Sequence, residues 1–512
     1  MENAIELRHI TKTFGKKVVA NKDVSLEVRK GEIPSLLGEN GSGKTTLMNM
    51  IAGIYYPDEG EIWVNGRPAE IRSPKDAYNL GIAMIHQHFK LVDVFTALEN
   101  IALGLEKQQK YDLGAIRKKA EEICEKYHFE LDLDQKIYEM SVSQKQTLEI
   151  VKALFRGADI LILDEPTAVL TPQETEKLFD VLRNMRRDHK SVVLITHKLH
   201  EVMEISNRVT ILRKGEYVGT VETKDATESL LTEMMVGQKV ELNIRRSEPK
   251  DPRKRLEIRN LSVTSREGVK VLDNVSFDVY SGEILGIAGV SGNGQKELLE
   301  AIAGLQTVEE GGSVKYYPQG DAAAMQLLGM TPRKIRDAGI HLSFVPEDRL
   351  GMGLVGSMGM IDNMMLKSYD SGHSFLADRK GPKELAERVK EELGVVTPGI
   401  NTPVSRLSGG NVQKVLVGRE IAADPVVLMT AYAVRGLDIN TSYTIYNLLN
   451  EQKEKGVAVI YVGEDLDVLL DLCDRILVLC GGKENGLLDG RAATKEQVGL
   501  LMTNLKNGGG KA

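Results

Sequence analysis

A glycine-rich stretch, GENGSGKTT at residues 38–46, decides the fold of this chain and fits the P-loop pattern. Its glycines let successive backbone N–H groups turn toward a phosphate, at a helix N-terminus that already favours anions. In this pattern the ammonium of Lys44 reaches the β- and γ-phosphates, and the hydroxyl of Thr45 ligates Mg²⁺. We therefore expect a nucleoside triphosphate to be bound by Gly38, Glu39, Asn40, Gly41, Ser42, Gly43, Lys44, Thr45 and Thr46.

The residues on both sides of the loop agree with this interpretation. An apolar strand is expected before it, and LMNMIAGI at residues 47–54 predicts an apolar helix after it. The alternative, a chance glycine-rich turn, gives no reason for a strand and a helix at these positions. Pro34 lies in the expected strand, where proline is unusual because it has no N–H to donate to a sheet.

A second motif, ILILDEP at residues 160–166, predicts a buried strand that ends in two carboxylates. Asp164 is placed to hold the water shell of Mg²⁺, and Glu165 to orient or deprotonate an attacking water. The alternative is a buried strand that ends in a solvated acidic turn. The presence of the P-loop in the same chain favours the catalytic interpretation.

Three further side chains are candidates for the same site. His197 ends the next apolar run and is expected to contact the γ-phosphate, although an isolated histidine more often packs in a core. Gln87 is expected to ligate Mg²⁺ and water through its amide, whereas His86 and His88 beside it lack a third metal ligand at suitable spacing. Phe14 is expected to stack on adenine, with core packing as the alternative.

The chain contains a domain-sized internal repeat. VSLEVRKGEIPSLLGENGSGK begins at Val24, and VSFDVYSGEILGIAGVSGNGQ begins at Val275, 251 residues downstream. In each half, short apolar runs alternate with helical stretches, which predicts a parallel sheet covered on both faces. We expect a first domain at 1–240, a charged, proline-containing linker at 241–255, a second domain at 256–505 and a disordered tail at 506–512.

Composition limits the function classes. The chain has 512 residues, 42% of them hydrophobic and 27% charged, which is ordinary for a globular protein. A net charge of −7 gives no electrostatic footprint for nucleic acid. Three cysteines without metal-ligand spacing fit a reducing, cytosolic compartment. With no apolar run of about 18 residues, a role at a membrane would require docking onto another subunit.

The order of P-loop, glutamine, SVSQKQ, LDEPT and histidine resembles the ABC transporter ATPases, and LSGGNVQK at residues 407–414 is similar to their signature motif. The resemblance covers both halves. It implies two tandem P-loop NTPase domains of the α/β class, each with a core parallel sheet, an antiparallel β subdomain and a helical subdomain. It also implies that each ATP lies between one half's P-loop and the other half's signature, which makes candidate ligands in trans of Ser408, Gly409, Gly410 and Asn411.

The second half departs from this pattern at the positions that carry the chemistry. Its counterparts of Lys44, Thr45, Asp164, Glu165, Gln87 and His197 are Gln295, Lys296, Ala431, Tyr432, Glu347 and Glu464. The first half departs only in its signature, where Ser143 replaces a glycine. Since the signatures act in trans, we expect one complete composite site, which joins Lys44 to Ser408-Gly409-Gly410, and one degenerate site.

Within the family, the fused pair without a membrane segment resembles the ATP-binding subunits of sugar and nucleoside importers. Within this group the chain most resembles the nucleoside-type branch, as in FVPEDRLGMGLV at residues 344–355. SVSQKQ departs from that branch and is closer to galactose-type subunits, so a ribose- or galactose-type importer is the alternative and the solute stays open. The resemblance implies two membrane permease subunits, an extracytoplasmic solute-binding protein and a location at the cytoplasmic face of the membrane. The segment HFKLVDVFTALEN at 88–100 is expected to grip a permease helix.

Two other classes of protein also contain ABC-type domains without a membrane segment. Soluble twin-ABC translation factors carry a long basic linker and two complete sites, whereas this linker is short and the second site is eroded. A regulator that senses ATP without turnover would not need Glu165 and His197. Both classes are therefore less favoured than an importer ATPase.

Overall fold

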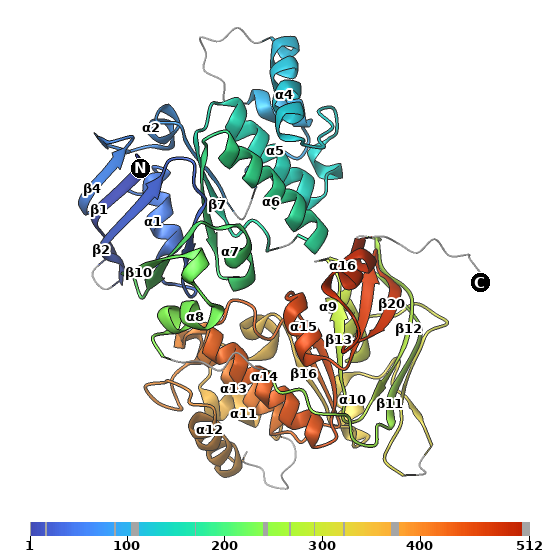
Figure 1. The fold of residues 1–512 in the computed structure, drawn as a ribbon. Coiled ribbons are helices and arrows are strands. Elements are labelled where there is room, and N and C mark those ends of the chain that lie inside the picture. The colour runs from blue at the N-terminus through green and yellow to red at the C-terminus, as the bar shows by residue number, and fades with distance from the viewer. Residues whose placement is uncertain are drawn as a thin grey trace. The chain divides into compact units, whose positions relative to one another are not determined.

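The computed structural model describes residues 2–15, 18–86, 89–103, 112–168, 170–238, 244–265, 268–290, 292–320, 323–369 and 378–503. The chain forms two compact units, Met1–Glu241 and Leu242–Ala512, drawn from blue to green and from yellow-green to red in Figure 1. Each unit contains a six-stranded sheet, a four-stranded sheet and helices, which confirms the expected tandem α/β architecture. The predicted tail at 506–512 lies outside the described residues.

The six-stranded sheet of the first unit has the order β10-β9-β3-β8-β7-β6. The five strands from β9 to β6 are parallel to one another, and β10 is antiparallel to β9. Strands of parallel sheets are covered on both faces, which explains their continuous apolar runs. The strands are β3 (Pro34–Leu37), β6 (Ile82–Ile85), β7 (Ile160–Asp164), β8 (Ser191–Thr196), β9 (Arg208–Arg213) and β10 (Glu216–Glu222).

The four-stranded sheet of the first unit is antiparallel, in the order β2-β1-β4-β5. Its strands are β1 (Asn3–Phe14), β2 (Val18–Arg29), β4 (Glu59–Val64) and β5 (Arg67–Ala69). One apolar core joins this sheet to the parallel one. Ile5 and Val24 of the four-stranded sheet pack in the same cluster as Leu36 and Ile162 of the parallel sheet. Leu47 of α1 (Lys44–Ile51) belongs to the same cluster. The P-loop helix is thereby anchored to both sheets.

Three helices of the first unit, α3, α4 and α5, build a separate apolar cluster that forms the expected helical subdomain. In Figure 1 the cyan helix α4 stands apart from the blue strands of the four-stranded sheet. The helices of the unit are α1 (Lys44–Ile51), α2 (Pro74–Asn79), α3 (Ala97–Ala102), α4 (Leu113–Tyr127), α5 (Val142–Phe155), α6 (Pro172–Arg187), α7 (Leu199–Ile205) and α8 (Glu228–Val236).

The second unit repeats this plan, with the sheet orders β16-β17-β18-β13-β19-β20 and β12-β11-β14-β15. Strands β16, β17, β18, β13 and β19 are parallel, and β20 is antiparallel to β19. The strands are β11 (Lys254–Thr264), β12 (Lys270–Tyr280), β13 (Ile284–Ala288), β14 (Ser313–Tyr316), β15 (Met325–Gln326), β16 (Leu342–Val345), β17 (Val427–Ala431), β18 (Ala458–Val462), β19 (Arg475–Cys480) and β20 (Lys483–Asp489).

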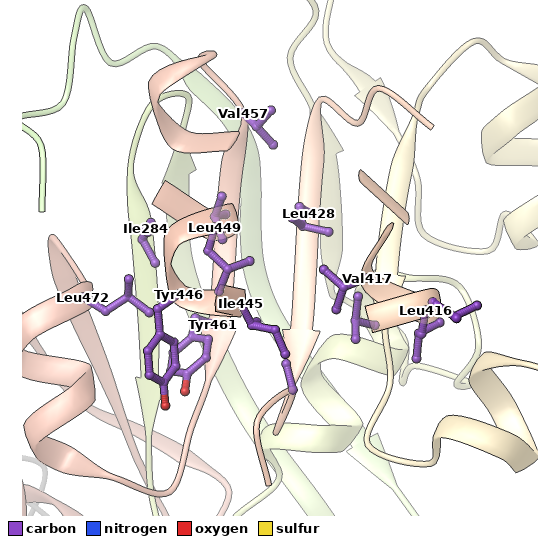
Figure 2. Packing of buried hydrophobic residues seen from close by; sticks show 14 of the residues in the cluster. Ile284, Leu416, Val417, Leu428, Ile445, Tyr446, Leu449, Val457, Tyr461 and Leu472 are labelled. Atoms are coloured by element: carbon purple, nitrogen blue, oxygen red, sulfur yellow. The ribbon is translucent and has the colours of Figure 1, made fainter. Parts of the chain in front are cut away.

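Several helices of the second unit pack on its parallel sheet, and others pack on those helices. The helices of the unit are α9 (Gln295–Ile302), α10 (Pro332–Asp337), α11 (Met360–Met365), α12 (Lys380–Glu392), α13 (Gly409–Ile421), α14 (Ile439–Glu454), α15 (Leu466–Leu472) and α16 (Lys495–Thr503). Figure 2 shows part of the core between helices and sheet, where Ile445 and Leu449 of α14 lie near Leu428 and Tyr461 of the strands. No helix among the described residues is both long and apolar enough to cross a bilayer.

Two local features explain what the sequence left open. Pro34 is the first residue of β3, a place in a strand where a missing N–H is tolerated. The segment expected as a linker is partly incorporated in the second unit: β11 already begins at Lys254, and Arg246 donates from Nη1 to the carbonyls of Leu470 and Cys473 at 2.8 and 2.6 Å. The charged residues before β11 therefore pack on the unit that follows them.

Candidate functional site

The P-loop connects β3 to α1 in a conformation that requires its glycines. Gly41 and Gly43 have φ of 80° and 93°, in the left-handed region where side chains with a Cβ are strained. A Cβ on Gly43 would lie 2.3 Å from the carbonyl oxygen of Ala20, and one on Gly38 would lie 2.4 Å from Oγ of Ser42. Gly43 caps α1 without a side-chain hydrogen bond, so the first amides of the helix are left to a ligand.

Lys44 lies inside the loop rather than in solvent. Its side chain is buried, and Nζ donates to the carbonyls of Gly38 at 2.7 Å and Glu39 at 3.0 Å. Burial lowers the pKa of the ammonium, against the attraction of Glu165, Asp164 and Glu39. Because carbonyl oxygens are weaker partners than phosphate oxygens, these two bonds are ones that an incoming phosphate can replace.

Asp164 and Thr45 meet at the carboxyl edge of the sheet, where parallel strands of this class place their ligands. Burial and the neighbouring Glu165 raise the pKa of Asp164 to about 6, opposed by a hydrogen bond from the Thr45 hydroxyl and by Lys44. A hydroxyl beside a carboxylate is a pair of hard oxygen donors of the kind that Mg²⁺ prefers. The residues present in the first unit therefore fit a Mg²⁺ ion.

Glu165 and His197 form a direct pair, with Nδ1 of the histidine 3.0 Å from Oε1 of the carboxylate. This hydrogen bond lowers the pKa of Glu165 despite its partial burial. Glu165 has φ of 48°, a left-handed backbone that is strained for a residue with a side chain. An ionised carboxylate, held by a histidine at the end of a strand, is a geometry suited to orient a water molecule.

Two predicted ligands of the first unit, Phe14 and Gln87, have less support from the geometry. Phe14 ends β1 with 38% of its surface exposed, in edge contact with Tyr55 at a centroid distance of 5.1 Å. It is thus accessible for stacking, and its role stays a prediction. Gln87 and His88 lie outside the described residues. Among the residues that the structure does describe, no group of three His, Cys, Asp or Glu is placed to hold a metal ion.

The two signature helices begin differently. In the first unit, Ser141 caps α5 by accepting from the amide of Gln144 at 3.2 Å, and the Gln144 side chain accepts from the amide of Ser141 at 2.8 Å. In the second unit, Ser408 makes no such cap on α13, and its hydroxyl accepts instead from Nδ2 of Asn411 at 2.8 Å. Of the two signature helices, α13 is therefore the one whose preceding residue does not cap it with a side chain.

The positions of the second unit that match Lys44 and Glu165 keep a similar backbone and carry different side chains. Gln295 is buried and donates from Nε2 to the carbonyl of Val290 at 3.1 Å, much as Lys44 folds back on its own loop. Tyr432 has φ of 51°, the same conformation as Glu165. Burial, reinforced by Glu464 and Glu347, raises the pKa of Tyr432 to about 12, so its hydroxyl stays neutral.

A pocket of 360 Å³ opens in the first unit between the parallel sheet and the helical cluster. Its wall is mainly apolar, and its charged members are Lys90, Glu149, Lys152 and Arg156. Of these, only Lys90 falls in the segment 88–100 expected to grip a permease. The other three, Glu149 and Lys152 of α5 and Arg156 at its C-terminal cap, were missed because they lie about 60 residues farther along the chain. Their i, i+3 and i+7 spacing marks one helix face.

Comparison with known proteins covers both units. The sequence profile of the ABC transporter family matches residues 21–168 and 272–430. The chain is similar to the nucleoside import ATP-binding protein NupA of Lactococcus lactis subsp. cremoris, with 42% identity over 509 residues and 98% of each chain covered. It is 40% identical over 507 residues to the guanosine import ATP-binding protein NupO of Bacillus subtilis, again over 98% of each chain. It is 38% identical over 510 residues to the ribose import ATP-binding protein RbsA 1 of Rubrobacter xylanophilus, also over 98% of each chain.

Proposed function

This chain belongs to the ABC transporter family, and we propose that it is the ATP-hydrolysing subunit of an importer for a nucleoside or a simple sugar. The observation that carries the proposal is the Glu165–His197 pair beside Lys44 and Asp164, in a chain similar along its whole length to import ATPases. The relatives also favour an importer over a twin-ABC translation factor.

Hydrolysis is assigned to the first unit. Lys44 exchanges its two carbonyl partners for the β- and γ-phosphate oxygens, and Glu165 orients the attacking water and accepts its proton. His197 holds the Glu165 carboxylate and contacts the γ-phosphate. Mg²⁺ would be held by the Thr45 hydroxyl, by the Gln87 amide and, through the water shell of the ion, by Asp164. When bound, the ion supplies positive charge that neutralises the phosphates. Phe14 would stack on the adenine.

The remaining contacts to the γ-phosphate are assigned to the second unit, acting in trans. They come from Ser408, Gly409, Gly410 and Asn411. The difference between the helix caps supports this assignment. Ser141 is already used to cap its own helix, whereas the first amides of α13 have no side-chain partner. An uncapped helix N-terminus is a ready anion site. We therefore propose one complete composite site, Lys44 facing Ser408, and one degenerate site at Gln295.

A nucleoside is the preferred solute. The relatives named for nucleoside and guanosine import match this chain slightly better than the relatives named for ribose import. Import of ribose or galactose is the second candidate, because the ribose relatives match over the same length. Binding of a solute by the permease and its binding protein, rather than by this chain, decides between the two.

The partners proposed are two integral-membrane permease subunits, with an extracytoplasmic solute-binding protein acting through them, and a peripheral location at the cytoplasmic face. The pocket beside Lys90 is the proposed docking groove for a permease helix. Its apolar wall suits an amphipathic helix. Its three cations, Lys90, Lys152 and Arg156, exceed its one carboxylate, Glu149, which favours a helix with acidic residues.

Two measurements test the proposal. The variant Glu165→Gln should lower ATP turnover by about 100-fold or more and leave ATP binding intact, because it removes the base and keeps the shape. The surface variant Glu130→Gln, which loses only an exposed pair with Lys177, is the control. Turnover of the wild type should also rise when its permease is supplied in membranes. Undiminished turnover of Glu165→Gln would refute the catalytic assignment, and indifference to the permease would refute the importer role.

A further inference from the structure

Arg435 bridges two carboxylates on neighbouring loops of the second unit. Its Nη1 lies 2.5 Å from Oε1 of Glu347, and its Nε lies 3.2 Å from Oε1 of Glu464. These residues follow strands β16, β17 and β18, which are adjacent in the sheet and parallel. Three loops that correspond to the nucleotide-contacting loops of the first unit are thus tied together by one guanidinium.

The first unit has no equivalent bridge at this position. Ala168 stands 267 residues before Arg435, at the matching point of the repeat, and its methyl group cannot pair with a carboxylate. There the described loops are joined by Glu165 and His197 instead. The loops of the first unit are therefore connected through residues that serve a nucleotide, whereas those of the second are connected through an arginine.

The second unit also does not fit a divalent metal ion. Where the first unit offers the hydroxyl of Thr45 and the carboxylate of Asp164, the second offers the ammonium of Lys296 and the buried methyl group of Ala431. A positive side chain and an apolar one are not metal ligands. Arg435, rather than a metal ion, supplies the positive charge beside the carboxylates of Glu347 and Glu464.

A second arginine carries this connection to the signature. Arg349 donates from Nη2 to the main-chain carbonyl of Arg435. Its Nη1 lies 3.2 Å from the place where a Cβ on Gly409 would stand, at the start of α13. Glu347, Arg349, Gly409 and Arg435 also line one pocket of 510 Å³. Contacts therefore run from Glu464 through the two arginines to the first glycine of the signature.

We propose that Arg435 is a positioning residue, which holds the Glu347 loop, the Glu464 loop and the signature segment of the second unit together without nucleotide or metal. The side chains of the bridge are 35–49% exposed, so its role is to fix geometry rather than to add much stability. The second unit then presents Ser408-Gly409-Gly410 in one arrangement, and only the first unit needs ATP to order its loops. The consequence for hydrolysis rests on the proposed function, whereas the fixing of the loops does not.

The direct test is hydrogen exchange of the full-length chain without nucleotide. In Arg435→Ala, amides of residues 346–352 and 463–468 should exchange about tenfold faster than in the wild type, because both ion pairs and the guanidinium are lost. Arg435→Lys should recover part of the protection. Arg259→Ala, which removes an arginine that also bridges two carboxylates, Glu257 and Asp278, is the matched control and should leave these segments unchanged.

Unchanged exchange in Arg435→Ala, or an equal effect of Arg259→Ala, would overturn the proposal. If Arg435→Ala does not fold, the single variants Glu347→Gln and Glu464→Gln each remove one arm, and each should loosen its own loop. The second readout is ATP turnover with permease: kcat should fall about five- to tenfold in Arg435→Ala, with ATP affinity unchanged and partial rescue by lysine. An unchanged kcat with loosened loops would overturn the positioning role. Absence of turnover in the wild type itself would contradict the proposed function and leave the exchange result standing.

Discussion

Asp164 places a carboxyl group at a position where the fold disfavours its ionised form. Burial and the nearby charge of Glu165 raise its pKa from 3.8 to about 6. A carboxyl group with a raised pKa binds protons more tightly in the folded state than in the unfolded state, so stability falls as pH rises between these two values. The residue that is proposed to serve the metal thus reduces the stability of the free protein.

The variant Asp164→Asn should therefore stabilise the nucleotide-free chain in a pH-dependent way. Below about pH 4 the two proteins should melt together, and above about pH 6 the variant should melt a few degrees higher, since about 1 kcal/mol corresponds to roughly 2–4 °C in a domain of this size. Melting curves across pH 4–8 measure this difference. A variant that is less stable than the wild type at pH 8 would show that the carboxylate is stabilising.

At the scale of residues, the sequence was informative where the chemistry is local. The P-loop residues are contiguous, so their spacing alone predicts them. The structure places the Thr45 hydroxyl beside Asp164, and the expected role of both residues toward Mg²⁺ stays a prediction. The bridge of Arg435 was not foreseen because its three members come from three separate strands. The difference between Ala168 and Arg435 across the repeat is the signal in the sequence that could have indicated it. The role of Gln87 stays a prediction because Gln87 lies outside the described residues.

At the scale of elements, the helices α5 and α13 differ in what the serine before each of them bonds. Both follow a serine, yet Ser141 bonds the amide of Gln144, and Ser408 bonds only the side chain of Asn411. A serine that caps its helix stabilises the fold, and one that does not is available to a ligand. Substitution of the two serines should therefore have opposite profiles.

Ser141→Ala should destabilise the chain by about 1 kcal/mol, the usual value of a lost N-cap, and change turnover less than about twofold. Ser408→Ala should shift stability by less than about 0.5 kcal/mol and lower turnover by about tenfold or more, through loss of a bond to a charged phosphate. Denaturation and ATPase assays of both variants give the comparison. If Ser141→Ala is the variant that loses turnover, the assignment of the active signature is reversed.

The strands of the parallel sheets were largely predictable because they are buried on both faces and carry continuous apolar runs. The start of β11 was not predictable from composition: the residues before it are charged and contain prolines, and Arg246 reaches carbonyls more than 200 residues downstream. A pattern of charge indicates a solvated linker only when no distant acceptor exists, and that information is absent from a local stretch.

At the scale of the whole molecule, a duplicated fold carries two unequal sets of residues. The first unit holds Lys44, Asp164 and Glu165, and the second holds the uncapped signature helix and the Arg435 bridge. The repeat was evident from the sequence, since its landmarks keep a nearly constant spacing. The inequality of function that we propose could be inferred only because the positions of the second unit can be compared with those of the first in the same chain.

The most direct test of the one-site account compares matching positions of the two P-loops. ATP turnover should be measured with permease for Lys44→Ala and Gln295→Ala, after melting curves show that both variants fold. Lys44→Ala should lose at least about tenfold in turnover, from the roughly 1.5–3 kcal/mol of one charge-assisted contact, while Gln295→Ala should stay within about twofold of the wild type. Equal losses in the two variants would contradict the account.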